Sequence, residues 1–162
     1  MKIILSALAL ALSLAGCASF HDPVPAGHSG AVATLSDTYT DYTGSTVQFF
    51  ILQKVDGKRV LDSAHQTAAG NTGRGFRMVP TIVGRRILPI EQTFTLAGYV
   101  QFATDAQALF GDNMLVTGDV RFTPRADEEY FVKGTLGLQK SSIWIEDSKG
   151  QPVTAKVERI GK

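Results

Sequence analysis

Apolar side chains at every second position in the second half of the sequence constrain the fold more than any other feature. The clearest run covers residues 93–102, where the apolar face would consist of Phe94, Leu96, Gly98, Val100 and Phe102. Successive side chains of a β-strand point to opposite faces of a sheet, so these residues would share one face. On a helix they would scatter around the axis. The run therefore predicts a strand with one face in a core.

Similar runs predict that most of the C-terminal half consists of strands. Residues 116–122 and 130–138 repeat the alternation, each with charged or small polar neighbours. Ile143 and Ile145 flank Trp144 in a further run, and a last strand is expected from about residue 152 to residue 160. Turn-forming residues separate these runs.

The N-terminal half predicts a hairpin and little helix. In part of residues 46–55 the odd- and the even-numbered positions are both apolar, which is typical of a strand covered on both faces. Asp56-Gly57 follows and indicates a hairpin turn. The best helical segment in the whole chain is 105–110, a turn or two at most. We expect an all-β fold, namely an antiparallel β-sandwich of transthyretin- or immunoglobulin-like type, or a small barrel.

The beginning of the chain has the features of an export signal. A single cation, Lys2, precedes an apolar run at 3–13, and Leu14-Ala15-Gly16-Cys17 follows it. A charged start, a short apolar stretch and a small-residue cleavage site are typical of a secretory signal. The run is too short to cross the roughly 30 Å hydrocarbon core of a bilayer. An ordinary secretory signal with an incidental thiol, or a buried helix, are the alternatives.

The residues Leu14-Ala15-Gly16-Cys17 resemble the lipobox of bacterial lipoproteins at all four positions. The resemblance implies that a diacylglyceryl group is attached to the thiol of Cys17, that a signal peptidase cuts between Gly16 and Cys17, and that the new amino group is acylated, as with palmitate. Two or three acyl chains anchor a protein stably, whereas one chain binds only marginally. Ala18 stands where an aspartate would favour inner-membrane retention. The resemblance therefore implies anchoring in an outer membrane, on its periplasmic face.

Composition divides the chain into three predicted parts: a lipoprotein signal peptide at 1–16, a lipidated flexible tether at 17–30 with two prolines and two glycines, and a single β-sandwich domain at 31–162. Cys17 is the only cysteine, so we expect the domain to be held together by packing without a disulfide. Without Lys2 the chain has 15 basic and 15 acidic residues. This balance argues against a nucleic-acid partner.

A second resemblance lies in the C-terminal quarter of the chain. Its segments are Phe122-Thr123-Pro124, Tyr130-Phe131-Val132-Lys133-Gly134 and Ser142-Ile143-Trp144-Ile145-Glu146-Asp147, followed by Lys156. These segments are similar to a pattern in small exported proteobacterial envelope lipoproteins of uncharacterised function. The resemblance implies the class of protein and carries no site residue.

Four arginines within thirteen residues form the most distinctive polar cluster, and they are Arg74, Arg77, Arg85 and Arg86. Arginine guanidinium groups bind carboxylates and phosphates through paired hydrogen bonds. The cluster predicts an anion- or partner-binding site, for which peptidoglycan carboxylates, lipopolysaccharide phosphates or an acidic protein are ligands at hand in an envelope. The alternative is a strand pair whose arginines meet Asp or Glu across the sheet.

Other polar groups give weaker indications of a site. His65 follows Asp62 and Ser63, which invites comparison with a catalytic triad, but three polar residues in one segment are more typical of a polar loop. His21 and His28 lie in the predicted tether and lack a fixed third ligand, so we expect no metal site. The glycine-rich run at 70–75 lacks the Lys-Ser/Thr of a phosphate-binding loop. Asp37, Tyr39 and Tyr42 belong to a strip that is either sugar-facing or simply an exposed edge.

These features predict a lipid-anchored protein of the bacterial cell envelope that acts as a non-enzymatic binding or accessory module. We expect no catalytic residue and no cofactor. The expected partners are the membrane, through lipidated Cys17, and an envelope protein or polymer. Two alternatives stay open. One is a hydrolase of an envelope polymer that uses His65 with a buried carboxylate. The other is an inhibitor of an envelope enzyme, with residues 70–89 as a protruding loop.

Overall fold

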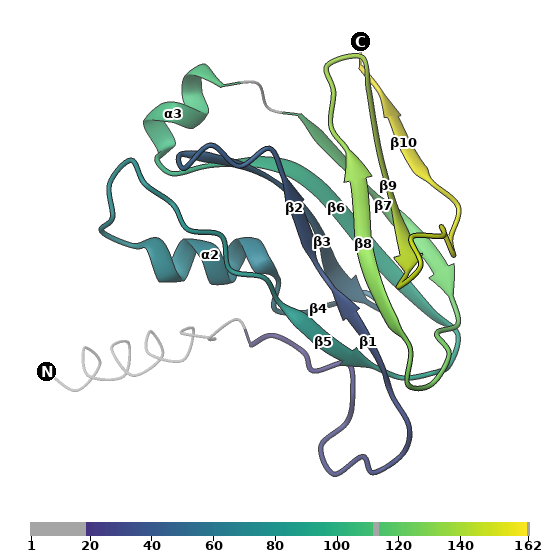
Figure 1. Cartoon of the computed structure of the whole chain (residues 1–162). Coiled ribbons are helices and arrows are strands. Elements are labelled where there is room, and N and C mark those ends of the chain that lie inside the picture. The colour runs from purple at the N-terminus through teal and green to yellow at the C-terminus, as the bar shows by residue number, and fades with distance from the viewer. Residues whose placement is uncertain (1–18, 112–113, 162) are drawn as a thin grey trace, which may run out of the picture.

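Two β-sheets packed face to face form the body of the protein (Figure 1). This computed structural model describes residues 19–111 and 114–161. The predicted signal peptide, the cleavage site between Gly16 and Cys17, and the lipidation site Cys17 lie outside the described residues. Within the described residues the two sheets do not join into a closed barrel. The prediction of an all-β sandwich is confirmed, and the barrel alternative is not adopted.

The first sheet has five strands in the order β10-β9-β8-β1-β5. Their bounds are Ala33–Ser36 for β1, Gly84–Ile87 for β5, Glu129–Thr135 for β8, Lys140–Asp147 for β9 and Val157–Ile160 for β10. All neighbours are antiparallel except β1 and β8, which are parallel. This one parallel pair joins segments almost a hundred residues apart, and the alternation pattern alone did not indicate it. The last strand is shorter than the predicted 152–160.

The second sheet has the order β2-β3-β6-β7, and β4 also pairs with β3. The bounds are Thr38–Thr40 for β2, Thr46–Val55 for β3, Lys58–Arg59 for β4, Gln92–Phe102 for β6 and Leu115–Phe122 for β7. Asp56 and Gly57 both have positive φ angles and form the predicted turn between β3 and β4. The predicted strands at 46–55, 93–102 and 116–122 are therefore confirmed to within a residue.

The space between the sheets is filled by the side chains that the alternation assigned to a core. Phe94 and Leu96 from β6 are fully buried there, against Val132 of β8 and Ile143 and Ile145 of β9. Burying a large apolar side chain contributes about 1.5–3 kcal/mol to folding. Packing between these two faces therefore provides most of the favourable free energy of folding of a domain whose described part contains no cysteine.

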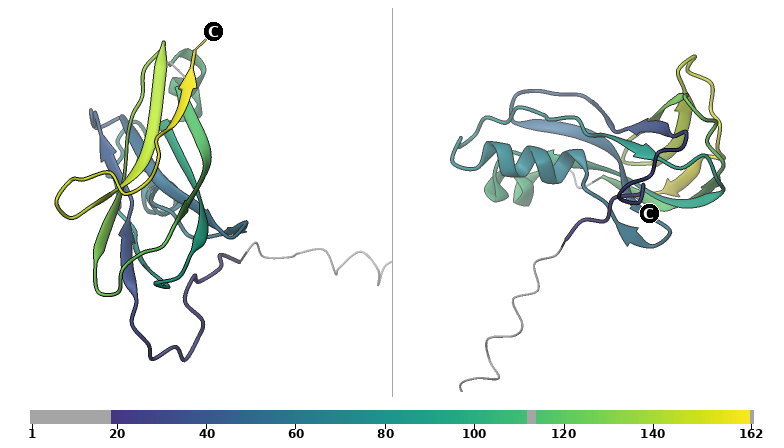
Figure 2. Two further views of the ribbon diagram at one scale, coloured as in Figure 1. Left: turned by 90° about the vertical axis from the view of Figure 1, so that its right-hand side faces the viewer. Right: turned by 90° about the horizontal axis from the view of Figure 1, so that it is seen from below.

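A helix covers the outer face of the second sheet. Helix α2, Ser63–Asn71, places Ala64 against a second apolar cluster that includes Phe49, Ile51 and Ala97, and Figure 2 shows the helix lying along this sheet. The prediction of a polar loop around His65 is wrong, because Asp62 caps the helix by accepting a hydrogen bond from the His65 backbone N–H. The short helix α3, Asp105–Phe110, has the predicted bounds.

The described part of the predicted tether packs on the domain over its first residues. Pro23 and Val24 are buried, and the backbone N–H of His21 donates to Arg59 O at 2.8 Å. Within the expected flexible tether at 17–30, residues 20–24 therefore lie packed on the domain. Burial of two apolar side chains offsets the loss of chain entropy that such a segment would otherwise retain.

We expect opposite effects of adding a methyl group at two glycines. A Cβ at Gly134 would overlap the ring of Phe50 and the carbonyl oxygen of Ser142, whereas a Cβ at Gly70, near the end of α2, meets nothing within 4 Å. Gly134→Ala should lower the free energy of unfolding by about 1–3 kcal/mol. Gly70→Ala should raise it by up to about 1 kcal/mol. Urea unfolding of both variants tests the packing, and an unaffected Gly134→Ala would contradict it.

Candidate functional site

The buried carboxylate of Asp37 lies where the chain passes from one sheet to the other. Strand β1 ends at Ser36 and β2 begins at Thr38, and only 1% of Asp37 is exposed. Its Oδ1 accepts a hydrogen bond from Leu52 N at 2.9 Å, and its Oδ2 accepts from Ser63 N at 2.8 Å. Oδ2 also accepts from Arg85 Nη2 at 2.7 Å. One side chain therefore joins both sheets and the start of α2.

Burial raises the pKa of the Asp37 carboxyl, while the charge of Arg85 and the hydrogen bonds from Arg85, Leu52 and Ser63 act in the opposite direction. The sequence predicts Asp37 in a strip with Tyr39 and Tyr42 that is either sugar-facing or an exposed edge. The two tyrosines are indeed exposed, but Asp37 is not. A bend between two strands turns its side chain inward.

Alternation along β5 points its two arginines in different directions. The Arg85 side chain is only 8% exposed and pairs with Asp37, whereas Arg86 is exposed. The alternative of an arginine that meets an acid across the sheet is thus realised for Arg85. The Nε and Nη1 atoms of Arg85 are buried and find no acceptor within 19–111 and 114–161. Three N–H bonds of this guanidinium therefore remain available.

A pocket of about 440 Å³ lies beside these arginines. Its walls come from the first described residues, the segment before α2 and the start of β5, and its lining residues are Phe20, His21, Asp22, Pro23, Val60, Leu61, Val83, Gly84, Arg85 and Arg86. Apolar walls with a few converging polar groups are typical of small ligand sites. Arg86 gives this pocket an exposed cation, and His21 adds a second polar group.

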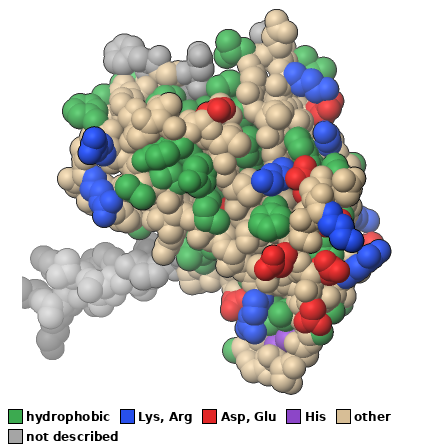
Figure 3. All heavy atoms as spheres, in the orientation of Figure 1, with side chains coloured by type: hydrophobic (Ala, Val, Ile, Leu, Met, Phe, Trp, Pro, Cys, Tyr) green, Lys and Arg blue, Asp and Glu red, His purple; other side chains and the backbone are tan. Residues whose placement is uncertain are grey.

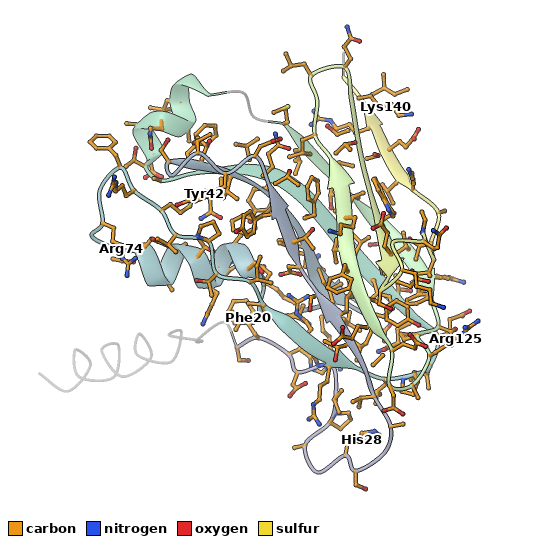
Figure 4. All side chains as sticks on the ribbon, in the orientation of Figure 1. Phe20, His28, Tyr42, Arg74, Arg125 and Lys140 are labelled. Carbon is orange, nitrogen blue, oxygen red and sulfur yellow. The ribbon has the colours of Figure 1, made fainter. Side chains whose placement is uncertain are left out.

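The other two arginines of the predicted cluster are not part of this pocket. Arg74 and Arg77 are exposed on the loop between α2 and β5, and Figure 4 shows Arg74 at the far end of α2 from Phe20. The side chain of Asn71 holds the base of this loop by exchanging hydrogen bonds with the backbone of Val79, at 2.8 and 2.9 Å. Phe76, near its tip, is 70% exposed. The structure thus brings together two of the four predicted arginines.

Both ring nitrogens of His65 have hydrogen-bond partners within the domain. Its Nδ1 lies 2.8 Å from the carboxylate oxygens of Asp62, and its Nε2 accepts a hydrogen bond from Arg59 Nη2. Arginine has no acceptor, so this geometry fits a neutral imidazole with its proton on Nδ1. The hydroxyl of Ser63 is buried and accepts a hydrogen bond from Val83 N. The nitrogen that a general base would present to a substrate is therefore already occupied.

Tyr99 lies beside His65 in a smaller pocket of about 210 Å³. Burial raises the pKa of its phenol, and the carboxylates of Asp62 and Asp37 raise it further. The tyrosine is thus a neutral hydroxyl at physiological pH. His65, whose ring nitrogens both have hydrogen-bond partners, and Tyr99 thus form a packed polar surface on this side of α2.

Charged groups on the face seen in Figure 3 are mixed in sign, with acidic and basic side chains side by side toward its lower right. A surface of this kind produces no long-range field that would steer a polyanion. No described helix is long and apolar enough to cross a membrane. In the part of the chain that the structure describes, no three His, Cys, Asp or Glu side chains gather in a way that could hold a metal ion.

No protein-family model, no curated protein and no solved structure matches this chain.

We expect Asp37→Ala to destabilise the fold strongly. The change removes the acceptor of two backbone N–H groups and leaves the charge of Arg85 buried without a partner. Breaking a buried ion pair in this way costs about 3–5 kcal/mol. Asp119→Ala, which removes an exposed carboxylate from β7, is the matched control and should change stability by less than about 0.5 kcal/mol. Equal effects in chemical denaturation would contradict the role assigned to Asp37.

Proposed function

We propose that this chain is a lipid-anchored protein of the bacterial cell envelope, on the periplasmic face of the outer membrane, and that its sandwich is a non-enzymatic binding or accessory module. The anchoring part rests on Leu14-Ala15-Gly16-Cys17, which matches a lipobox at all four positions. The binding part rests on one observation. The pocket of about 440 Å³ combines apolar walls with Arg86 and lies where the described chain begins.

The polar groups of the domain support binding over hydrolysis. A hydrolase needs a base with a lone pair directed at its nucleophile. The Nε2 lone pair of His65 is directed at Arg59 instead, and Ser63 is buried beneath the start of β5. Removing a proton from a substrate at this site would require breaking the contact between His65 and Arg59.

The pocket suits a ligand with one anionic group and an apolar part. Arg86 is an exposed cation of its lining, and Arg85, which also lines it, is paired with Asp37. Carboxylate and phosphate oxygens match guanidinium donors in number and geometry. In an envelope, such groups occur on peptidoglycan, on lipopolysaccharide and on acidic segments of proteins. The module would hold one of these near the membrane.

Replacing the anchor residue tests the first part of the proposal. Cys17→Ser removes the thiol to which a diacylglyceryl group would be attached. In cells, the unaltered protein should partition with membranes and carry the mass of the acyl chains on its N-terminal peptide. The variant should lack this mass. It should also leave the membrane fraction without detergent, because one apolar signal run does not replace two or three acyl chains. Identical masses and extraction behaviour would refute lipid anchoring.

Splitting the arginine cluster tests the second part. Arg86→Ser removes the exposed cation of the pocket, and Arg77→Ser removes an exposed cation of the loop as a matched control. Mass spectrometry of proteins and muropeptides that co-purify with each detergent-extracted variant should show a specific companion that is reduced about tenfold or more by Arg86→Ser, since loss of a charged hydrogen bond costs about 1.5–3 kcal/mol. Arg77→Ser should retain it. Turnover of an envelope polymer that His65→Ala abolishes would instead establish the hydrolase.

A further inference from the structure

The first described residues are fastened to the sandwich at several points. The ring of Phe20 packs edge-on against His65, with centroids 5.4 Å apart, and the guanidinium carbon of Arg59 lies 5.7 Å from the Phe20 ring centroid. His21 N donates to Arg59 O at 2.8 Å, and Val24 is buried. The chain thus meets the domain at Phe20, well before residue 31.

Covalent geometry limits how far this contact can be from a lipid on Cys17. A fully extended chain covers at most about 3.6 Å per residue, so the three residues from Cys17 to Phe20 span no more than about 11 Å. The polar headgroup layer of one leaflet is itself roughly 5–8 Å thick. A lipid anchor at Cys17 would therefore hold Phe20 close to the membrane surface, without a wide layer of water between the domain and the bilayer.

The surface around Phe20 has the composition that membrane interfaces favour. Phe20 is 39% exposed, and Lys58 and Arg59 on the β3–β4 hairpin are exposed cations. Figure 2 shows this hairpin beside the start of the described chain in both views. Apolar aromatic side chains insert at the boundary between headgroups and acyl chains, and Lys and Arg are attracted to an anionic lipid surface.

The nearby carboxylates are engaged in contacts within the domain. Asp22 Oδ1 accepts a hydrogen bond from Val24 N at 3.0 Å. Asp56, at the tip of the hairpin, accepts from Thr93 N at 2.9 Å and from Gln92 Nε2 at 3.2 Å. Two exposed cations and two exposed carboxylates thus lie at this end of the domain, and the docking rests mainly on Phe20 and on the short chain between it and Cys17.

We propose that the face formed by Phe20, Lys58 and Arg59 docks directly on the bilayer surface, so that the sandwich lies against the membrane in a fixed orientation. This inference rests on the proposed lipid anchoring. It makes the segment 19–24 a short strap with one docked position. The pocket beside Arg86 shares Phe20 with this face, so a ligand would enter it at the level of the headgroups.

Position-specific quenching in membranes tests the orientation. Cys17 is the only cysteine, so once it carries a lipid an engineered cysteine is the only free thiol. The full-length lipidated protein is reconstituted in vesicles that contain phosphatidylglycerol and a headgroup-level nitroxide lipid, with an environment-sensitive fluorophore at Lys58→Cys, which leaves Phe20 and Arg59 of the docking face in place. Lys140→Cys is the matched control, because Lys140 is 59% exposed and lies at the opposite end of the domain from Phe20 (Figure 4).

We expect severalfold stronger quenching at position 58 than at position 140. Adding Phe20→Ala, which removes the contact with His65 and Arg59, should reduce the quenching at position 58 while the mass that the acyl chains add to the N-terminal peptide stays unchanged. Equal, weak quenching at both positions in a protein with a lipidated Cys17 would overturn the docking and leave the anchor intact. A protein without lipid on Cys17 would overturn both.

Discussion

Three hydrogen-bond donors from three elements converge on the carboxylate of Asp37, and the rest of the fold depends on this contact. The chain bends at Asp37 to pass from the first sheet to the second, so β2 pairs with β3 only as far as Phe50. Beyond that point β2 no longer pairs with β3, and the backbone N–H of Leu52 donates to Asp37 Oδ1 instead. A buried N–H without an acceptor would cost about 1–3 kcal/mol. The same carboxylate fixes where α2 begins, through Ser63 N.

The position of the candidate pocket follows from this contact. Arg85 turns inward because Asp37 provides a buried partner, and alternation along β5 then turns Arg86 outward. The segment before α2 supplies Val60 and Leu61 to the opposite wall. A single acid thus sets the register of β5, the start of the helix and, through both, the shape of the site.

Patterns within one strand could be read from the sequence, whereas contacts between distant segments could not. Alternation identified β6 and β7 because each has one face in the core, and Asp56-Gly57 identified its hairpin because only a few residues adopt positive φ there. Helix α2 escaped detection because it buries small residues such as Ala64 and Thr67, which leaves no apolar period. The Asp62 cap before an Ala-containing run was the available signal.

The arginine cluster shows the same limit at the level of the site. Four arginines close in sequence suggested one surface, but Asn71 holds the loop that carries Arg74 and Arg77 beside the C-terminal end of α2. The buried partner of Arg85 is 48 residues away in the chain. No local pattern gives a pairing over that separation. The parallel pairing of β1 with β8 was beyond local inference for the same reason.

The wall of the pocket and the position of the anchor both depend on the strap being part of the folded domain. Hydrogen exchange of the His21 and Val24 amides in the membrane-bound protein measures this directly. We expect both amides to exchange much more slowly than unstructured chain, since they donate to Arg59 O and to Asp22 Oδ1. Exchange at the rate of a free peptide, with the core strands protected, would contradict a folded strap and would indicate a domain that moves freely on its tether.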